Sequence, residues 1–117
     1  MNVYDKAHEL ARALKLAPEV IEYKSAMEKI NSNPNHKRMV EDFRKKQLEL
    51  YSQQLKGVEP SKEQIDSLNN LLNIISLNPE IRNYLEAEMR FSRLWEDIMK
   101  ILGDAMDIDF TEELIKK

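Results

Sequence analysis

The chain has 117 residues, of which 42% are hydrophobic and 33% are charged, and its formal net charge is -3. This length suits one domain, and this balance of hydrophobicity and charge belongs to a folded chain, not to a disordered one. Cysteine is absent. Its absence excludes disulfides, thiolate catalysis, and iron–sulfur or zinc sites held by cysteine.

Turn-forming residues are scarce, with only two glycines and four prolines in the chain. A β-rich protein of this length would need many more of them. We therefore predict an all-α fold, an elongated helical bundle of about five helices with two long helices. We expect a single helical domain over residues 1–117, with a core at 2–103 and a flexible or short helical tail at 104–117.

The first two helices are predicted from their starting residues. One helix begins after Asn2 and carries apolar residues on one face. A second begins at Pro18, because proline is tolerated in the first turn of a helix. The beginning of the chain lacks the basic start and apolar core of a signal peptide, and no apolar run approaches the roughly 20 residues of a membrane helix. We expect no membrane insertion and a cytoplasmic location.

Two Asn-Pro pairs, Asn33-Pro34 and Asn78-Pro79, are each predicted to form a corner between two helices. Asparagine is a good helix cap, proline suits the first helical turn, and a residue before proline is pushed out of the α region. Each corner is preceded by a short helix and followed by a long one. This arrangement hints at a helix–corner–helix duplication.

The three later helices follow from these corners and from the remaining caps. The third runs from the first corner to about Lys56 and ends at Gly57. Ser61 and Gln64 form a capping box that opens a fourth helix. The fifth runs from the second corner to about Leu102 and stops near the next glycine, Gly103.

The fifth helix is apolar on more than one face, so one stripe can pack internally and the other suits a partner helix. We predict a partner interface from the fifth helix and the end of the third: Tyr84, Leu85, Met89, Phe91, Trp95, Met99, Tyr51 and Leu55. In the alternative, the shorter helices cover all of this surface. Gln47 and Glu88 interrupt the stripes, and they either fix the register of packed helices or face solvent.

Groups that could perform chemistry are few. His8 and His36 lie in different helices and are interpreted as solvated surface side chains. The segment from Asp107 to Thr111 begins like a calcium loop, but Glu112 stands where the sharp turn needs glycine. Neither a glycine-rich phosphate loop nor a nucleophile elbow is present. We predict no enzymatic activity, no cofactor and no metal.

A cluster of basic residues in the third helix is the one candidate for contact with RNA phosphates. Its members are Lys37, Arg38, Arg44, Lys45 and Lys46. Glu41 and Asp42 lie among them at helical i,i+4 spacing, a pattern that ordinarily supports a solvated helix face. We favour the solvated face and keep RNA contact as the alternative.

Four segments carry a resemblance to a known family: "NVYDKAHELARAL", "EYKSAMEKINSNP", "RMVEDFRKKQLELYSQQLKG" and "LNPEIRNYLEAEMRFSRLWEDIMKIL". In these segments the chain resembles the YlbF/YmcA family of small helical bacterial proteins, and in particular its YheA-type members. The resemblance implies an all-helical fold, dimerisation, no enzymatic activity and a cytoplasmic setting in Gram-positive-type bacteria.

The resemblance also implies a regulatory role. Better-studied members of the family look like regulatory subunits that influence competence, biofilm formation and sporulation by modulating a ribonuclease involved in mRNA processing. Some carry cysteines implicated in iron–sulfur binding, and since this chain has none, the resemblance does not extend to that cluster.

We therefore expect a non-enzymatic, adaptor-like interaction protein. Its partner would be a second copy in a homodimer, or a hetero-complex with family paralogues or a ribonuclease regulatory complex. The alternative function is an RNA-contacting accessory protein that uses the basic residues of the third helix.

Overall fold

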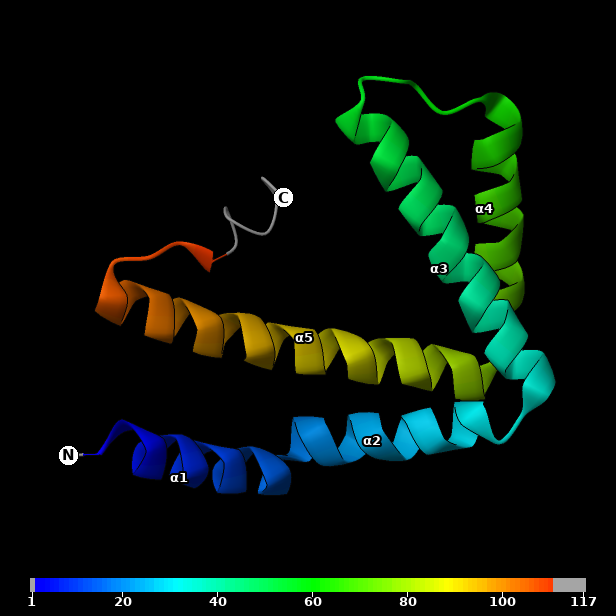
Figure 1. Cartoon of the computed structure of the whole chain (residues 1–117). Coiled ribbons are helices and arrows are strands. Elements are labelled where there is room, and N and C mark those ends of the chain that lie inside the picture. The colour runs from blue at the N-terminus through cyan, green and yellow to red at the C-terminus, as the bar shows by residue number, and fades with distance from the viewer. Residues whose placement is uncertain (1, 111–117) are drawn as a thin grey trace. The chain divides into compact units, whose positions relative to one another are not determined.

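The computed structural model describes residues 2–110, and within that range the chain forms five α-helices and no strand (Figure 1). The helices are α1 (Val3–Leu16), α2 (Pro18–Asn31), α3 (Pro34–Leu55), α4 (Lys62–Ser76) and α5 (Pro79–Met106). The two long ones, α3 and α5, have 22 and 28 residues. The predicted all-α fold with two long helices is confirmed.

Asparagine caps open three of the helices. The side-chain oxygen of Asn2 accepts a hydrogen bond from the backbone N–H of Tyr4 at 2.8 Å. Asn33 caps α3 by accepting from the two backbone N–H groups that follow Pro34. Asn78 accepts from the corresponding N–H groups at the start of α5, each at 3.1 Å. Both Asn-Pro pairs are thus the helix corners that their capping chemistry predicts.

The predicted boundaries around the loop between α3 and α4 are also confirmed. Gly57 has φ of 74°, a left-handed conformation that glycine adopts without steric cost. Val58 donates to the carbonyl of Gln53 at 2.9 Å, which closes the last turn of α3. Ser61 and Gln64 then form the capping box that opens α4, with each side chain accepting from the other's backbone N–H.

The predicted end of α5 near Gly103 is wrong, because the helix continues to Met106. The left-handed residue is Asp107, with φ of 60°, and the N–H of Ile108 donates to the carbonyl of Gly103 at 2.9 Å. Gly103 is buried inside the last turn, and a Cβ there would lie 2.5 Å from the Ile108 carbonyl oxygen and 3.4 Å from the Phe110 ring. This glycine permits close chain packing and does not end the helix. Residues 111–117 of the predicted tail, including Thr111 and Glu112, lie outside the described residues.

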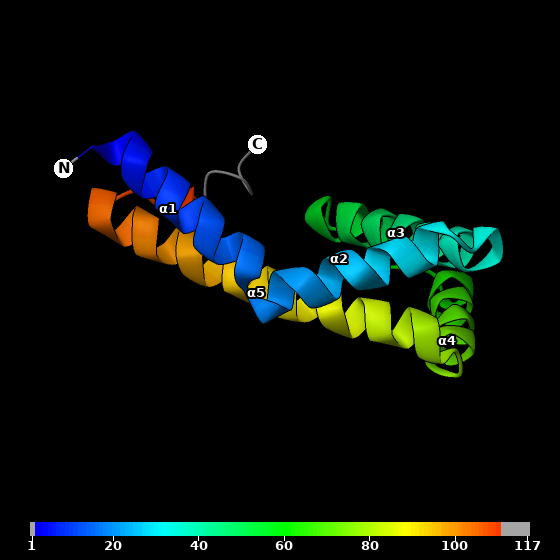
Figure 2. The ribbon, with the colours of Figure 1, turned by 90° about the horizontal axis from the view of Figure 1, so that it is seen from below.

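The described chain divides into two compact units: a first unit of residues 2–23 and 86–110, and a second unit of residues 24–85. In the first unit, α1 and the start of α2 run antiparallel to the later part of α5 (Figures 1 and 2). In the second unit, α3 and α4 form an antiparallel pair (Figure 1). The single helical domain stays a prediction.

Burial differs sharply between the two units. Seven of the eight buried hydrophobic residues among those described lie in the second unit: Ala26, Ile30, Val40, Phe43, Ile75, Ile81 and Tyr84. The eighth, Ala87, belongs to the first unit. The described part of the first unit therefore has no large apolar side chain that is fully buried.

Replacing Gly103 tests the packed end of α5. At an open helical position, glycine to alanine raises helix stability by roughly 1 kcal/mol. For Gly103→Ala we expect the opposite, a lower melting temperature by circular dichroism, because the new Cβ forces the Ile108 carbonyl to move. Asp107→Gly is the matched variant, and we expect it to raise the melting temperature because glycine relieves the left-handed strain. A higher melting temperature for Gly103→Ala would contradict this account.

Candidate functional site

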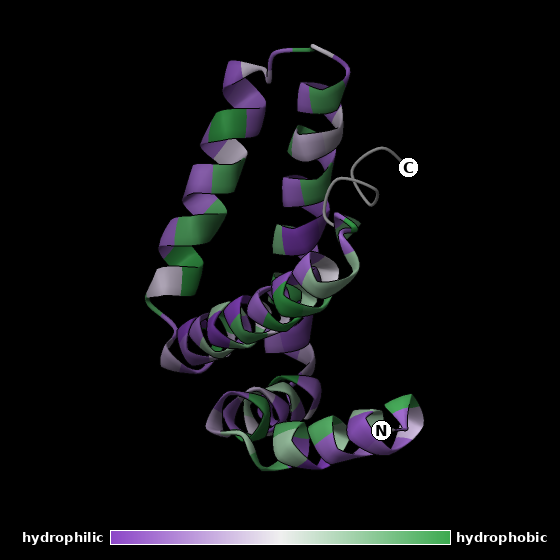
Figure 3. Ribbon diagram, turned by 90° about the vertical axis from the view of Figure 1, so that its left-hand side faces the viewer, coloured by the Kyte–Doolittle hydropathy of each residue, from purple (hydrophilic) through white to green (hydrophobic). Residues whose placement is uncertain are grey.

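Helix α1 exposes almost all of its side chains. None of its residues is buried, although hydrophobic and hydrophilic residues alternate along it (Figure 3). Val3 and Tyr4 are 79% and 78% exposed, and Leu14 is half-buried. Lys6 and Glu9 form an ion pair on its surface at 3.2 Å. Several apolar side chains of α1 are thus exposed, and the described part of the first unit covers the helix only in part.

The first part of α5 in the first unit is held against α2 by three contacts. The rings of Tyr23 and Phe91 stack with centroids 5.0 Å apart. The Tyr23 hydroxyl donates to the Glu88 carboxylate at 3.3 Å, and Arg90 pairs with Glu22 at 3.3 Å. Glu88 is therefore half-buried and joins two helices, whereas Gln47, the other polar interruption, is exposed on α3.

Beyond Phe91, apolar side chains of α5 remain only partly covered. Leu94 and Ile98 are half-buried, while Trp95 is 48% exposed and Ile101 is 67% exposed. We call the exposed apolar residues of α1 and of α5 beyond Phe91 the first-unit apolar surface: Val3, Tyr4, Leu10, Leu16, Trp95, Ile101, Leu102 and Met106. Trp95 is the one residue of this surface that also belongs to the interface predicted from the sequence.

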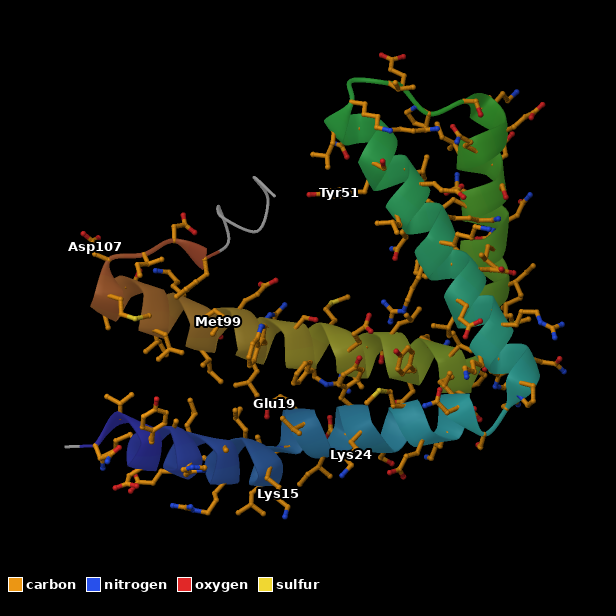
Figure 4. The ribbon with its side chains drawn as sticks, in the orientation of Figure 1. Lys15, Glu19, Lys24, Tyr51, Met99 and Asp107 are labelled. Carbon is orange, nitrogen blue, oxygen red and sulfur yellow. The ribbon has the colours of Figure 1, made fainter. Side chains whose placement is uncertain are left out.

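The eight residues of the predicted interface have different environments. Met89, Trp95, Tyr51 and Leu55 are exposed, Leu85, Phe91 and Met99 are half-buried, and Tyr84 is buried. In the view of Figure 4, Tyr51 projects from α3 on the side away from α4. Tyr84 belongs to the core of the second unit, where its hydroxyl accepts from Arg44 at 3.1 Å. The assignment of these eight residues to an interface stays a prediction.

The basic residues of α3 do not all share one environment. Lys37, Arg38 and Lys45 are exposed, whereas Lys46 and Arg44 are half-buried. The Arg44 guanidinium lies over the Tyr84 ring at 5.7 Å from its centroid, in addition to its hydrogen bond to the hydroxyl. Glu41 and Asp42 are exposed on the same helix. Arg44 therefore has a packing role that a basic pattern alone does not indicate.

His36 links the two Asn-Pro corners. Its Nδ1 lies 3.1 Å from the Glu80 carboxylate, and its Nε2 lies 2.8 Å from the side-chain nitrogen of Asn78. The His36 side chain is 21% exposed. Its interpretation as a solvated surface residue is wrong, because the ring is largely covered and both of its nitrogens contact other side chains. His8 is exposed on α1, as expected.

Carboxylates gather around a surface depression at the end of α5, lined by Glu96, Asp97, Asp104, Asp107 and Asp109. Lys100 also lines it and pairs with Asp104 at 3.0 Å. Among residues 2–110, no group of three or more histidine and carboxylate side chains is arranged to hold a metal ion. None of the helices described is both long and apolar enough to cross a membrane.

Comparison with known proteins gives a family match over nearly the whole chain. The family described as "Control of competence regulator ComK, YlbF/YmcA" matches residues 3–107. A UPF0342 protein of Clostridium tetani is 48% identical over 113 residues, which cover 97% of each chain. A UPF0342 protein of Caldicellulosiruptor bescii is also 48% identical over 113 residues, covering 97% of this chain and 93% of that protein.

Two solved structures share the fold. One is titled "Protein of Unknown Function (DUF964) from Bacillus stearothermophilus", with a TM-score of 0.72 and 18% identity, and the match covers 90% of this chain and 92% of that one. The other is "yheA from Bacillus subtilis", with a TM-score of 0.60 and 24% identity, covering 92% and 97%. At these identities the similarity concerns the fold alone.

Removing Arg44 tests its packing role. We expect Arg44→Ala to lower the free energy of unfolding by about 1–2 kcal/mol, since the variant loses the hydrogen bond and the cation–π contact to Tyr84. The matched control is Lys45→Ala, which removes an exposed cation from the next position and should change the free energy by less than about 0.5 kcal/mol. Urea unfolding measures both, and equal effects would argue against the packing role.

Proposed function

Because the chain belongs to the YlbF/YmcA family of competence control, we propose that it is a non-enzymatic regulatory protein that acts by packing its helices against another chain. The observation that carries this proposal is the first-unit apolar surface. It consists of helical residues whose side chains are apolar and exposed.

The length of α1 gives this observation its weight. The helix has 14 residues, and isolated helices of about 12–15 residues are only marginally stable in water, so most helices depend on packing of an apolar face. Within the described chain, α1 buries no residue. A helix whose apolar side chains remain largely exposed is ordinarily an association site. A further chain that covers these side chains would supply the missing stabilisation.

A second copy of the same chain is the partner we propose. The first unit is an antiparallel pair of helices, and two such pairs related by a twofold axis would bury the same surface on each copy, as in a four-helix bundle. Trp95 and Tyr4 are large, exposed aromatic side chains on this surface. Aromatic residues of this kind often contribute most of the binding energy at an interface. A specific dimer would bury about 1,000 Å² or more in total.

The resemblance to regulatory family members supports an adaptor role for the same surface. A hetero-complex with a family paralogue, or with a ribonuclease regulatory complex that acts on mRNA processing, competence, biofilm formation or sporulation, would use the same helix pairing. The homodimer and the hetero-complex therefore compete for one apolar surface. A cytoplasmic location fits such partners.

The test compares Trp95→Glu with Arg93→Gln. Each variant lowers the net charge by one, but Arg93 is an exposed polar residue of the same helix. We expect the wild type to be a dimer by light scattering, Trp95→Glu to weaken the dimer at least about tenfold, and Arg93→Gln to leave it unchanged, since burying an unpaired carboxylate is costly. Ile101→Gln is a second variant at a site that is already 67% exposed, so the protomer should keep its helicity.

Trp95 also reports on association directly, because it is the only tryptophan in the chain. On dilution of the wild type, its emission should shift to longer wavelength as the dimer dissociates. A wild-type chain that remains a monomer with an unchanged emission spectrum at every concentration would contradict the homodimer. A shift seen only on titration with a purified paralogue would assign the surface to a hetero-complex instead.

The RNA-contacting alternative rests on the exposure of Lys37, Arg38 and Lys45 on α3. If these cations contact phosphates, binding to single-stranded RNA should weaken with salt, and each lost contact should reduce the log–log slope by about 0.7. Replacing all three by alanine should then abolish binding, while Arg93→Ala on α5 should not. No binding of the wild type at low salt would remove this alternative.

A further inference from the structure

We propose that His36 and Asn78 form a proton-linked cap, in which protonation of His36 draws the Asn78 side-chain oxygen away from the start of α5. The His36 ring contacts Asn78 through Nε2 and Glu80 through Nδ1. All three residues belong to the second unit. The device is separate from the helix-pairing surface of the proposed function.

The orientation of the Asn78 amide is fixed by its capping role. Its oxygen accepts from the backbone N–H groups of Glu80 and Ile81, each at 3.1 Å. The amide nitrogen therefore points to the other side, where His36 Nε2 lies 2.8 Å away. An amide nitrogen can only donate. His36 Nε2 must then accept, so it carries a lone pair and no proton.

The contact with Glu80 completes the assignment of the tautomer. With Nε2 unprotonated, the neutral ring carries its proton on Nδ1, and this N–H donates to the Glu80 carboxylate at 3.1 Å. Both ring nitrogens are therefore satisfied only in the neutral Nδ1–H form. This neutral form lets Asn78 keep its cap on α5, and it places no charge on the half-buried His36 ring.

Protonation changes one of these contacts from attractive to repulsive. The protonated ring keeps its Nδ1–H bond to Glu80. Its new Nε2–H, however, faces the Asn78 amide nitrogen, which lies 2.8 Å from Nε2 and is also a donor, so the two groups repel each other. Turning the Asn78 amide over restores an acceptor for Nε2–H. The same rotation directs the amide nitrogen at the N–H groups of Glu80 and Ile81, so α5 loses its cap.

Glu80 is the charged group that touches the ring, and it comes from α5. Arg82, also on α5, donates to the Ser76 carbonyl at the end of α4 at 3.0 Å. Lys37 follows His36 on α3 and is exposed, as is Lys29 in the last turn of α2. Glu80 can accept from the ring in either protonation state, whereas the Asn78 amide nitrogen can only donate to it. Rotation of the Asn78 amide therefore lets the protonated ring keep its contact with Glu80.

The consequence reaches the core of the second unit. The first turns of α5 carry Ile81 and Tyr84, which are 0% and 7% exposed. Ile81 is itself one of the two residues whose N–H the Asn78 oxygen caps. Loss of the cap would loosen the turn that holds these core residues, so the protonation state of His36 would tune the packing of the second unit.

The test is an NMR titration of the full chain labelled with ¹⁵N. At pH 8 we expect the His36 ring to show the Nδ1–H tautomer. Between pH 8 and 5.5 the chemical shifts of the Glu80 and Ile81 backbone amides should change with the same midpoint as those of the His36 ring. The hydrogen-exchange rates of these amides, corrected for the pH dependence of intrinsic exchange, should rise about fivefold as the cap is lost. His8→Gln is the matched control, because removing the other histidine should leave the response of both amides unchanged.

Asn78→Asp separates the proposed exchange from a general effect of acid. A carboxylate has acceptors on both oxygens, so it can cap α5 and accept from protonated His36 at once. In this variant the rise in the exchange rates of the Glu80 and Ile81 amides should be lost, because the cap is kept in both protonation states of His36. An Nε2–H tautomer at pH 8 in the wild type would overturn the proposal. An equal rise in the two exchange rates in Asn78→Asp would also overturn it.

Discussion

The buried apolar side chains of this protein lie near the two Asn-Pro corners, where helices end and begin. Because burial is confined there, the far halves of the long helices carry exposed apolar side chains. The buried residues Ile30 and Ile75 close α2 and α4, and Ile81 opens α5. Along α3, burial stops at Phe43, so the second half of that helix has no buried residue. The hydrophobic contribution to stability scales with the apolar area removed from water. This hydrophobic stabilisation is therefore localised in the second unit. Many apolar side chains of the long helices α3 and α5 stay partly exposed.

The polar groups that the chain partly buries connect helices. Tyr23 with Glu88, Arg44 with Tyr84, and His36 with Asn78 each link residues at least forty positions apart. Such contacts fix which helix faces which, because a buried polar group without its partner loses the hydrogen bond that offsets its desolvation. His36 and Glu88, which the sequence analysis considered for a functional role, thus join helices in the fold. Under the proposed function, pairing with another chain through helix faces depends on this precision.

Sequence reasoning identified those parts of the fold that local chemistry determines. Asn2, the Asn-Pro pairs, Gly57 and the capping box all act within a few residues of their own position, so their helix boundaries were predictable. Gly103 misled because a glycine near a helix end suits two purposes: a left-handed residue after the last turn, or a close contact inside it. Only the positions of Ile108 and Phe110 decide between them.

The environments of His36, Tyr84 and Glu88 could not be predicted for a different reason. Each depends on a partner from another helix, and helical periodicity gives the face of a residue but not what lies opposite. Tyr84 and Trp95 fall on one apolar stripe of α5, yet the first is 7% and the second 48% exposed. The difference arises because Tyr84 meets Arg44 and the second-unit core, whereas Trp95 lies along the part of α5 that pairs with α1.

The two units therefore differ in what stabilises them. The second unit has a core of its own, and its corners are joined by hydrogen bonds between side chains and by helix caps. The described part of the first unit has stacked rings, ion pairs and half-buried apolar residues, which leave α1 without a buried side chain. A partner that binds only the folded form stabilises it in proportion to its concentration and affinity. Under the proposed function, folding of α1 is then coupled to association. A regulator built in this way would respond to the abundance of its partner through the unit that lacks a core, while the other unit stays folded.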